Sequence, residues 1–452
     1  MEVYVDDEEE YIPFLTTRRH YLDHPESDNE EEEEKMELST GGVRTKKRKS
    51  SENKRELPLP PSDFEPFVHQ RPLHRAFVQL PSHLDASASV IGRQWLDLSH
   101  KELIIWIALV IYQGLYRLPS LDQYWNEDEK LPLHHISKQM SLKCFEIIKR
   151  FLHISSPAAT INNYFEKLEP LLSHIRNVSK QLYVPNSNVS VDEMVIRFSG
   201  RSIHIIRIKN KPTPEGFKIL SLCESGYTYT FLLTSRVSLN NVTKVYGLSK
   251  TGCLVYHLVE QLPYSGFSFN IYMDNYFTSI PLFQYLRQIN IGACGTIRKT
   301  SSGFPKELKV DKNIKFNWDI RSGIITNSAL VVFWQDNGPV TMLTTIHGLV
   351  GDEWKVERER QRPRETSTNA VKVRTVFGTE SKKKLKIPRV IDDYNNYMNG
   401  VDVADQLRSY YSMQQTTRRN WMPLFFWLLD TAIINTYRII ITSGLTKEHK
   451  EF

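Results

Sequence analysis

The stretch NVSVDEMVIRF, residues 188–198, decides the fold because apolar and polar side chains alternate along it, as they do in a half-buried β-strand. Three more β-branched and aromatic runs follow it, at 202–209, 217–225 and 227–233. Glycine and proline separate these runs. The pattern predicts three or four consecutive strands.

Downstream of these runs, helical and strand patterns alternate. A helical pattern over 243–262 precedes the strand FNIYMD (269–274), and a second helical pattern over 279–290 precedes the strand IGACGTIR (291–298). A meander of strands followed by helix, strand, helix and strand indicates an α/β core over residues 186–300.

The flanking segments differ from this core. Residues 66–185 read as helical, and Ser99 with Glu102 predicts a capping box at a helix start. Residues 301–388 form short strands and a charged tract, which predicts a β-rich insertion. Helical patterns return in the last helix of the core (389–411) and in a second helical segment (412–452).

Residues 1–65 are expected to be a disordered tail with an acidic and a basic part. The basic cluster RTKKRK (44–49) is typical of a nuclear localisation signal, and a solvated charge run explains it equally well. The apolar stretches 103–116 and 421–441 fall short of the roughly 20 apolar residues of a membrane span. We therefore expect buried core helices and no membrane partner.

Charge is distributed unevenly along the chain. The formal net charge is +6, but residues 1–40 contain 15 acidic and 3 basic side chains, so the remainder carries +18. A basic body favours a nucleic-acid partner, although an ordinary soluble surface would also account for it. The four cysteines are far apart, so neither disulfides nor a zinc site is expected.

Aspartates recur in unusual contexts. Asp192 interrupts the first strand, Asp274 ends a later one, and Asp402 and Asp405 share a helix face. Several carboxylates brought together would suit Mg²⁺, which prefers oxygen ligands. Taken singly, each residue also has a structural explanation, such as an arginine partner, a helix cap or a solvated face. For Asp274, a cap is the weaker explanation because Thr278 and Ser279 are better placed.

Six ordered blocks of this sequence resemble the piggyBac transposase family over roughly residues 66–440. The blocks are SVDEMVIRFSGR, KNKPTPEGFK, MDNYFTSIPLFQYL, GACGTIRK, YNNYMNGVDVADQLRSYYS and RRNWMPLFFWLLD. The resemblance implies an RNase H-like catalytic core interrupted by a β-rich insertion, with flanking helical DNA-binding and dimerisation segments.

The resemblance also implies the chemistry. It assigns catalysis to Asp192, Asp274 and Asp402, which would bind two Mg²⁺ ions (or Mn²⁺) with Asp405 in support; Asp336 ranks well below them. Neither zinc nor a small-molecule cofactor is expected. Such enzymes nick transposon ends, form hairpins through the freed 3′-hydroxyl and join the ends to TTAA targets. The alternative is a domesticated, non-catalytic nuclear DNA-binding protein.

Basic and aromatic side chains in the same blocks are candidates for contact with double-stranded DNA. They are Arg201, Lys211, Arg298, Lys299, Arg418, Arg419 and Trp421. By family analogy we expect a nuclear homodimer that binds transposon ends and TTAA target DNA.

The sequence departs from the family pattern in three places. Asn399 replaces a glycine, Glu215 replaces an aromatic residue, and the sequence reaches Phe452 without a cysteine-rich module. Many family members recognise transposon ends with that module. Its absence argues against autonomous transposition.

Overall fold

A computed structural model describes most of the chain from residue 98 to residue 444. The residues in this range that it leaves undescribed are 129, 156–163, 209–212, 235–241, 243, 310–317, 320, 327, 350–353, 416 and 418. The expectations for the tail, including the basic cluster 44–49, fall outside the described residues.

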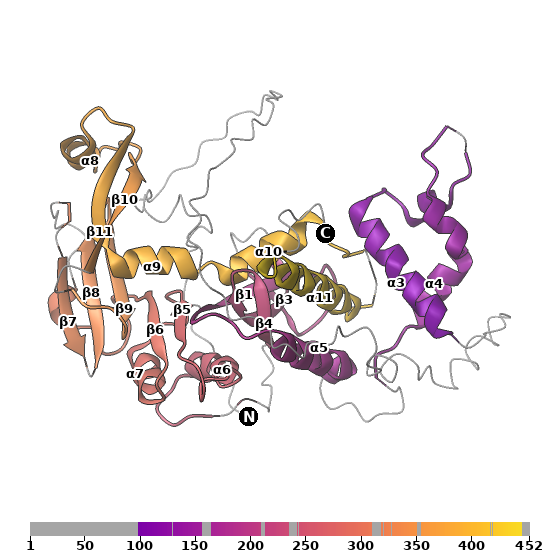
Figure 1. The fold of residues 1–452 in the computed structure, drawn as a ribbon, viewed down its shortest axis with the longest axis horizontal. Coiled ribbons are helices and arrows are strands. Elements are labelled where there is room, and N and C mark those ends of the chain that lie inside the picture. Colours follow the sequence, from indigo (N-terminus) through magenta and orange to yellow (C-terminus); the bar gives the residue numbers. More distant parts are fainter. Residues whose placement is uncertain are drawn as a thin grey trace.

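A mixed sheet forms the centre of the molecule (Figure 1). Strand β1 (Asn188–Arg197) pairs antiparallel with β3 (Glu215–Glu224) and parallel with β5 (Asn270–Met273). Strand β4 (Tyr227–Thr234) continues the sheet beyond β3, and β6 (Gly292–Thr296) runs parallel to β5. This arrangement confirms the predicted α/β core.

Helices cover both faces of this sheet (Figure 1). On one face α6 (Lys250–Val259) and α7 (Ile280–Gln288) pack on apolar side chains such as Val191 of β1. On the other face lie α9 (Arg389–Tyr397) and α10 (Gly400–Tyr410). The central strands are therefore buried on both sides, including the polar residues Ser190, Asp192 and Glu193 of β1. The alternation at 188–198 thus belongs to a fully buried strand and not to the half-buried one that it predicted.

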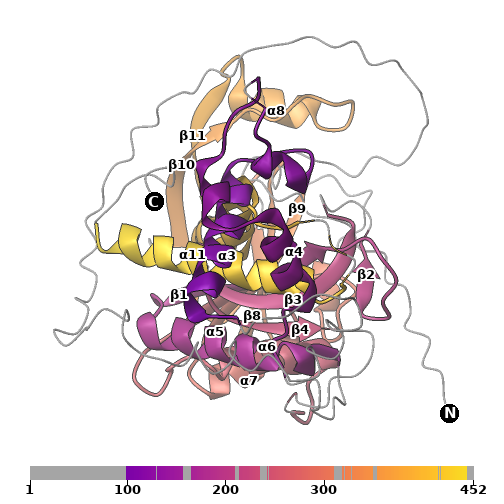
Figure 2. The same ribbon diagram turned by 90° about the vertical axis from the view of Figure 1, so that its right-hand side faces the viewer.

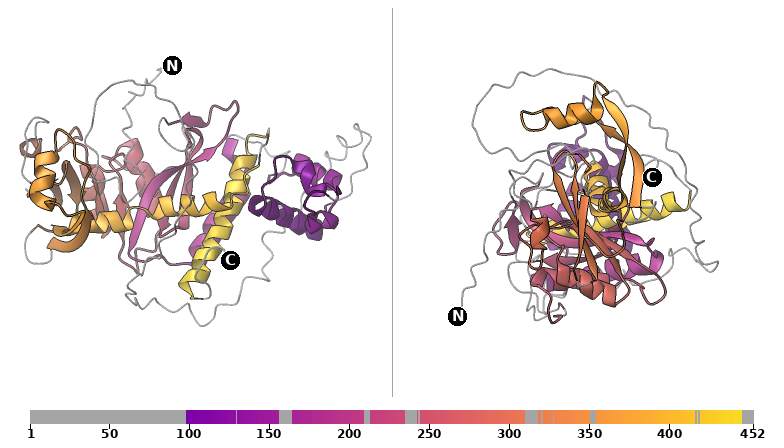
Figure 3. Two further views of the ribbon diagram at one scale, coloured as in Figure 1. Left: turned by 90° about the horizontal axis from the view of Figure 1, so that it is seen from above. Right: turned by 90° about the vertical axis from the view of Figure 1, so that its left-hand side faces the viewer.

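The expected insertion divides into two parts. Strands β7 (Arg321–Thr326), β8 (Ala329–Gln335) and β9 (Pro339–Thr344) extend the main sheet, because β9 pairs antiparallel with β6. The rest forms a separate two-stranded sheet with one helix at the far end of the molecule (Figure 3). These elements are β10 (Lys355–Gln361), α8 (Ala370–Phe377) and β11 (Lys382–Pro388).

One helix was expected at the end of the core, but the structure has two, α9 and α10, separated at Met398 and Asn399. Gly400 explains the close approach of the second helix to the sheet. A Cβ atom there would lie 2.6 Å from Ser190 Oγ and 2.9 Å from the Cys223 carbonyl oxygen. Glycine therefore lets the start of α10 touch β1 and β3.

Gly400→Ala should lower the free energy of unfolding by about 2 kcal/mol, because the added methyl group overpacks this contact. Gly338→Ala is the matched control, since a Cβ at Gly338 meets nothing within 4 Å. Urea denaturation of both variants measures the difference. Equal stability of the two would contradict the close approach.

The helical flank is built from two distant parts of the chain. Helices α3 (His100–Leu115), α4 (Leu142–Phe151) and α5 (Glu169–Leu182) precede the sheet, and α11 (Met422–Thr442) follows it. The predicted capping box of Ser99 and Glu102 is present at the start of α3. Short 3-10 helices span Leu121–Trp125, His135–Gln139, Tyr164–Lys167 and Lys306–Leu308.

One apolar core joins these helices to the sheet. The Trp106 ring of α3 lies 5.6 Å from the Phe145 ring of α4 and 6.1 Å from the Phe425 ring of α11. Ile196 and Phe217 of the sheet belong to the same buried cluster. Figure 2, which faces the α3–α4 end, shows α11 crossing behind these two helices.

Helix α11 is long and apolar enough to cross a membrane by length and composition alone, but 56% of its most apolar window is buried inside the protein. Its buried Asp430 and Asn435 bond internally. Asn435 accepts a hydrogen bond from the Thr228 amide (2.8 Å) and donates to the Thr228 carbonyl (2.9 Å). These contacts are those of a core helix, as the sequence predicted.

Burial raises the pKa of Asp430 in α11 to about 7, although the Met413 amide (3.0 Å) donates a hydrogen bond to its carboxylate. A raised pKa means that the folded state binds the proton more tightly than the unfolded chain does. The resulting stability is present at low pH and is lost as pH rises through about 7.

Asp430→Asn should therefore flatten the decline of the unfolding free energy between pH 5 and pH 8. Within that window the change removed is about 3 kcal/mol, because roughly two pH units of it lie between the unfolded and the folded pKa. Urea denaturation at both pH values, with wild type alongside, checks it. Identical pH slopes would show that Asp430 does not retain its proton.

Candidate active site

Two of the predicted aspartates lie side by side in the centre of the sheet, where β5 ends beside the middle of β1. In the parallel pairing of β1 and β5, Val191 is opposite Met273. One step further along, the same register places Asp192 beside Asp274. Neighbouring strands lie about 4.8 Å apart, so the pairing brings together two residues 82 positions apart in the sequence.

Both carboxylates project from the face that α9 and α10 cover. Side chains two positions apart on a strand point to the same face, so Ser190 and Tyr272 indicate the direction of Asp192 and Asp274. Ser190 lies against Gly400, and the Tyr272 ring is 5.2 Å from the Tyr397 ring of α9. The helix pair therefore overlies the strands that carry the two acids.

Helix α10 runs along β1 past Asp192. Gly400, at its start, meets Ser190, and Arg408, near its end, contacts the Met194 sulfur at 2.6 Å. Because Asp192 lies midway between Ser190 and Met194 on the same face, it is beside the middle of α10. Asp192 is itself only 8% exposed.

Asp402 and Asp405 occupy one flank of α10. Val403 and Leu407 pack toward Gly226, at the turn between β3 and β4. With 3.6 residues per turn, Asp402 and Asp405 lie on roughly the opposite side of α10. Asp402 is partly buried, whereas the Asp405 side chain is 59% exposed. Both acids thus stand on the helix that packs on β1, the strand that carries Asp192.

The turn after β5 holds the Asp274 carboxylate. Its Oδ1 accepts hydrogen bonds from the backbone amides of Tyr276 (2.9 Å) and Phe277 (3.4 Å). Ser279 is the N-cap residue of α7, as predicted, but its side chain makes no cap bond, and the Thr278 hydroxyl donates to the Asp274 carbonyl instead. Asp274 therefore orders this turn as well as lying beside Asp192.

Sequence reasoning missed a buried arginine beside the acids. Arg408 is 5% exposed, and its guanidinium contacts Asp405 Oδ1 at 3.4 Å and lies 5.4 Å from the Trp427 ring centre. The spacing of three residues from Asp405 on a helix could have indicated the pair. Burial raises the pKa of the nearby Cys223 thiol to about 12, and the charges of Asp192 and Asp405 add to that shift while Arg408 opposes it.

The donor chemistry of this region fits a hard divalent cation, since all four candidates supply carboxylate oxygens. Among the described residues, however, no group of three or more His, Cys, Asp or Glu side chains is arranged to hold a metal ion. Within this region, the strand pairing fixes only the closeness of Asp192 to Asp274.

Asp336, the lower-ranked candidate, lies elsewhere. It follows β8 and is separated from β5 by β9 and β6. Asp336 is 1% exposed, and its Oδ2 accepts a hydrogen bond from Arg360 Nη2 at 2.8 Å. These contacts are those of a buried structural ion pair.

Three of the predicted basic residues lie on described parts of the core. Arg298 follows β6 and donates through Nε to the Asn275 side-chain oxygen (3.2 Å), next to Asp274. Lys299 adjoins it and is partly buried, and Arg201 is exposed in the loop after β1. Lys211 and Arg418 fall outside the described residues.

The remaining two candidates make internal contacts. The Arg419 guanidinium donates to the carbonyl oxygens of Arg150 (2.7 Å) and Leu152 (2.8 Å) at the end of α4. Burial lowers its pKa. Trp421 is 7% exposed and lies 4.6 Å beneath the Arg419 guanidinium. This pair ties the start of α11 to the end of α4.

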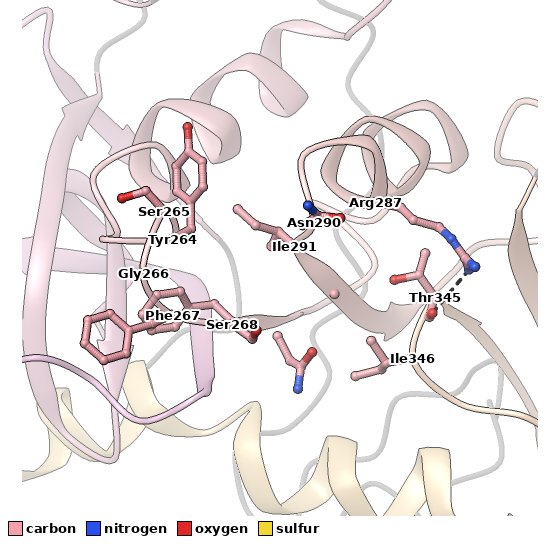
Figure 4. A pocket seen from close by; sticks show the side chains of 13 residues that line it. Tyr264, Ser265, Gly266, Phe267, Ser268, Arg287, Asn290, Ile291, Thr345 and Ile346 are labelled. Atoms are coloured by element: carbon pink, nitrogen blue, oxygen red, sulfur yellow. Dashed lines mark hydrogen bonds between the residues drawn. The ribbon is translucent and has the colours of Figure 1, made fainter. Parts of the chain in front are cut away.

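A 680 Å³ opening lies at the other end of β5, where β5 and β6 begin (Figure 4). Phe267 and Ile346 line it, and Arg287 projects beside it. Arg287 Nη1 donates to the carbonyl oxygens of Ser328 (2.8 Å) and Thr345 (3.3 Å), so this cation is already bonded. The opening is separate from the strand end that carries Asp274.

A family model described as Transposase IS4 matches residues 64–437, most of the chain. The chain belongs to this piggyBac-type transposase family. The resemblance seen in the sequence blocks is thereby confirmed.

Two human proteins are similar in sequence to this chain. PiggyBac transposable element-derived protein 3 is 25% identical over 355 residues, and PiggyBac transposable element-derived protein 2 is 22% identical over 353 residues. Each match covers 76% of this chain and 56% of the relative. The chain thus spans about half the length of these curated relatives.

A solved structure shares the fold. It is the piggyBac transposase synaptic complex with hairpin DNA, which superimposes with a TM-score of 0.65 at 20% sequence identity. The match covers 83% of this chain and 75% of that one. The α/β core and its helical flank are therefore the transposase fold.

Arg419→Gln should lower the free energy of unfolding by about 2 kcal/mol, because carbonyl oxygens at the end of α4 would lose a charged hydrogen-bond donor. Arg201→Gln, on an exposed loop, should change it by less than about 0.5 kcal/mol. Urea denaturation of both variants distinguishes the buried structural role of Arg419 from the exposed surface position of Arg201. A stable Arg419→Gln protein would refute the structural role of Arg419.

Proposed function

We propose that this chain is a piggyBac-type DNA transposase that cleaves and joins DNA strands at the carboxylates of β1, β5 and α10. The observation that supports it best is the register of β1 and β5, which sets Asp192 beside Asp274 beneath the helix that carries Asp402. In this proposal the acids of β1, β5 and α10 share a metal site, in addition to the turn that Asp274 orders.

In this proposal Asp192, Asp274 and Asp402 hold two Mg²⁺ ions, with Asp405 in support and Mn²⁺ as a substitute. Bound in this way, the metal would activate a water or 3′-hydroxyl and stabilise the leaving oxygen of a phosphodiester. Neither zinc nor a small-molecule cofactor takes part.

Backbone amides, helix α10 and basic side chains of the protein orient, cover and partly neutralise the acids of this site. The turn amides of Tyr276 and Phe277 orient the Asp274 carboxylate, and α10 covers Asp192, which limits access of water. Arg408 offsets part of the negative charge from the buried side. Arg298 and Lys299 lie near Asp274, where cations would attract the phosphate backbone of a polyanion.

The substrate in this proposal is double-stranded DNA, as transposon ends and TTAA targets. The solved relative is named as a complex with hairpin DNA, which supports a hairpin intermediate. We further propose a homodimer that acts in the nucleus, with the basic cluster 44–49 as its import signal.

A domesticated, non-catalytic DNA-binding protein is the second candidate. The human relatives are named as transposable element-derived proteins, and the match spans only 56% of each. In that case the acids would remain as part of the scaffold. The two candidates differ in whether the carboxylates are needed for DNA cleavage.

Asp274→Asn should lower the rate of strand cleavage on TTAA hairpin DNA by at least about 100-fold in Mg²⁺ or Mn²⁺, because a carboxylate metal ligand is lost. Glu380→Gln, on an exposed turn, is the matched control. Gel-resolved cleavage products, with EDTA as a metal-free reaction, provide the measurement. Equal activity in wild type and Asp274→Asn, or none in either, would refute catalysis and favour the second candidate.

A further inference from the structure

Helix α9 connects the insertion to the acids of α10. It ends at Tyr397, three residues before Gly400, and Figure 1 shows the two helices following one another across the sheet. Two successive carboxylates on α9, Asp392 and Asp393, take no part in the proposed chemistry. Both are bonded to the insertion.

Asp392 forms a two-point ion pair with the two-stranded sheet. Arg358 of β10 donates through Nε to Oδ1 (2.6 Å) and through Nη2 to Oδ2 (2.7 Å). Asn396, one turn further along α9, also donates to Oδ2 (3.2 Å). A bidentate arginine–carboxylate pair fixes orientation as well as distance, which a lysine cannot do.

Asp393 is bonded to another part of the insertion, the loop that follows β9. Its Oδ2 lies 3.0 Å from His347 Nε2, and His347 Nδ1 lies 2.8 Å from the Thr344 hydroxyl. Thr344 is fully buried at the end of β9, where it pairs with Cys294 of β6. The chain of contacts thus runs from the core sheet through His347 to α9.

Bonds from two successive helix residues fix how the helix is rotated about its own axis. On α9 these bonds, which we call anchors, are those of Asp392 and Asp393. Side chains at adjacent positions project about 100° apart, so Asp392 and Asp393 are bonded in different directions by two different parts of the insertion. The packing of Tyr397 on Tyr272 limits sliding along the helix axis. Rotation or shift of α9 would be passed to α10 through the short turn at 398–399.

We propose that Arg358 and His347 are positioning residues, which set the place of Asp402 relative to Asp192 and Asp274 by fixing α9. This inference rests on the proposed function for its consequence in catalysis. It assigns a role to the charged tract that contains Arg358, EWKVERERQRPRETSTN, which the sequence explained only as a polar segment. The insertion would then be part of the catalytic machinery through its contact with α9.

The test compares Arg358→Gln with Lys382→Gln. Lys382 forms an exposed ion pair with Glu359 (2.8 Å) on the same two-stranded sheet, so its loss controls for general loosening of that sheet. Hydrogen exchange of the amides in 400–410 should rise about 10-fold in Arg358→Gln and stay at the wild-type rate in Lys382→Gln. That result would show that the anchor acts on α10.

Catalysis gives the second readout. In Arg358→Gln, the turnover rate on TTAA hairpin DNA should fall about 10-fold or more and the Mn²⁺ concentration for half-maximal activity should rise, as for other groups that orient metal ligands. The Kd for the DNA should stay within about 2-fold of wild type. The charge-exchanged double variant Arg358→Asp with Asp392→Arg should recover part of both losses, which a merely unfolded sheet could not.

The outcomes separate the two proposals. Unchanged exchange in 400–410 overturns the positioning role. If the wild-type protein cleaves DNA, a turnover rate and Mn²⁺ dependence of Arg358→Gln equal to wild type also overturns it. Faster exchange in α10 of Arg358→Gln with no cleavage by the wild-type protein supports the anchor and refutes the proposed function. Failure of the double variant to recover either property also overturns the positioning role.

Discussion

The parallel pairing of β1 with β5 is the constraint on which this site depends. Parallel strands need a long crossover, so the chain must build β3, β4 and α6 before it returns beside β1. The register then sets the end of β5 beside the middle of β1, where Asp192 lies. A shift of one residue would turn Asp274 to the opposite face, where α6 and α7 form an apolar core.

Much of the core could be predicted from the sequence because its strands carry strong alternating patterns. The strand at 188–198, the later strand before Asp274 and the capping box at Ser99 all appear as expected. The break before Gly400 was not predicted. It depends on close contact with Ser190, and no local pattern encodes a contact between positions 210 residues apart.

The candidate site was less predictable than the fold. Family resemblance selected the four acids; the strand register sets Asp192 beside Asp274, while the four-acid arrangement and its metal binding remain a prediction. Arg419 and Trp421 show the limits of composition: a basic residue beside an aromatic one suggested an exposed nucleic-acid surface. In the fold Arg419 donates to carbonyl oxygens at the end of α4, because helix carbonyl groups need donors when they are covered, and Trp421 is buried beneath the Arg419 guanidinium.

The pairing of β9 with β6 has a consequence for shortening this protein. Since β7–β9 continue the hydrogen-bond ladder of the core, a truncation at residue 301 would leave β6 as a bare edge whose amides and carbonyls could recruit strands from other molecules. A soluble minimal version must therefore retain the chain through Thr344. The boundary suggested by the sequence is thus not a place where the polypeptide can be cut.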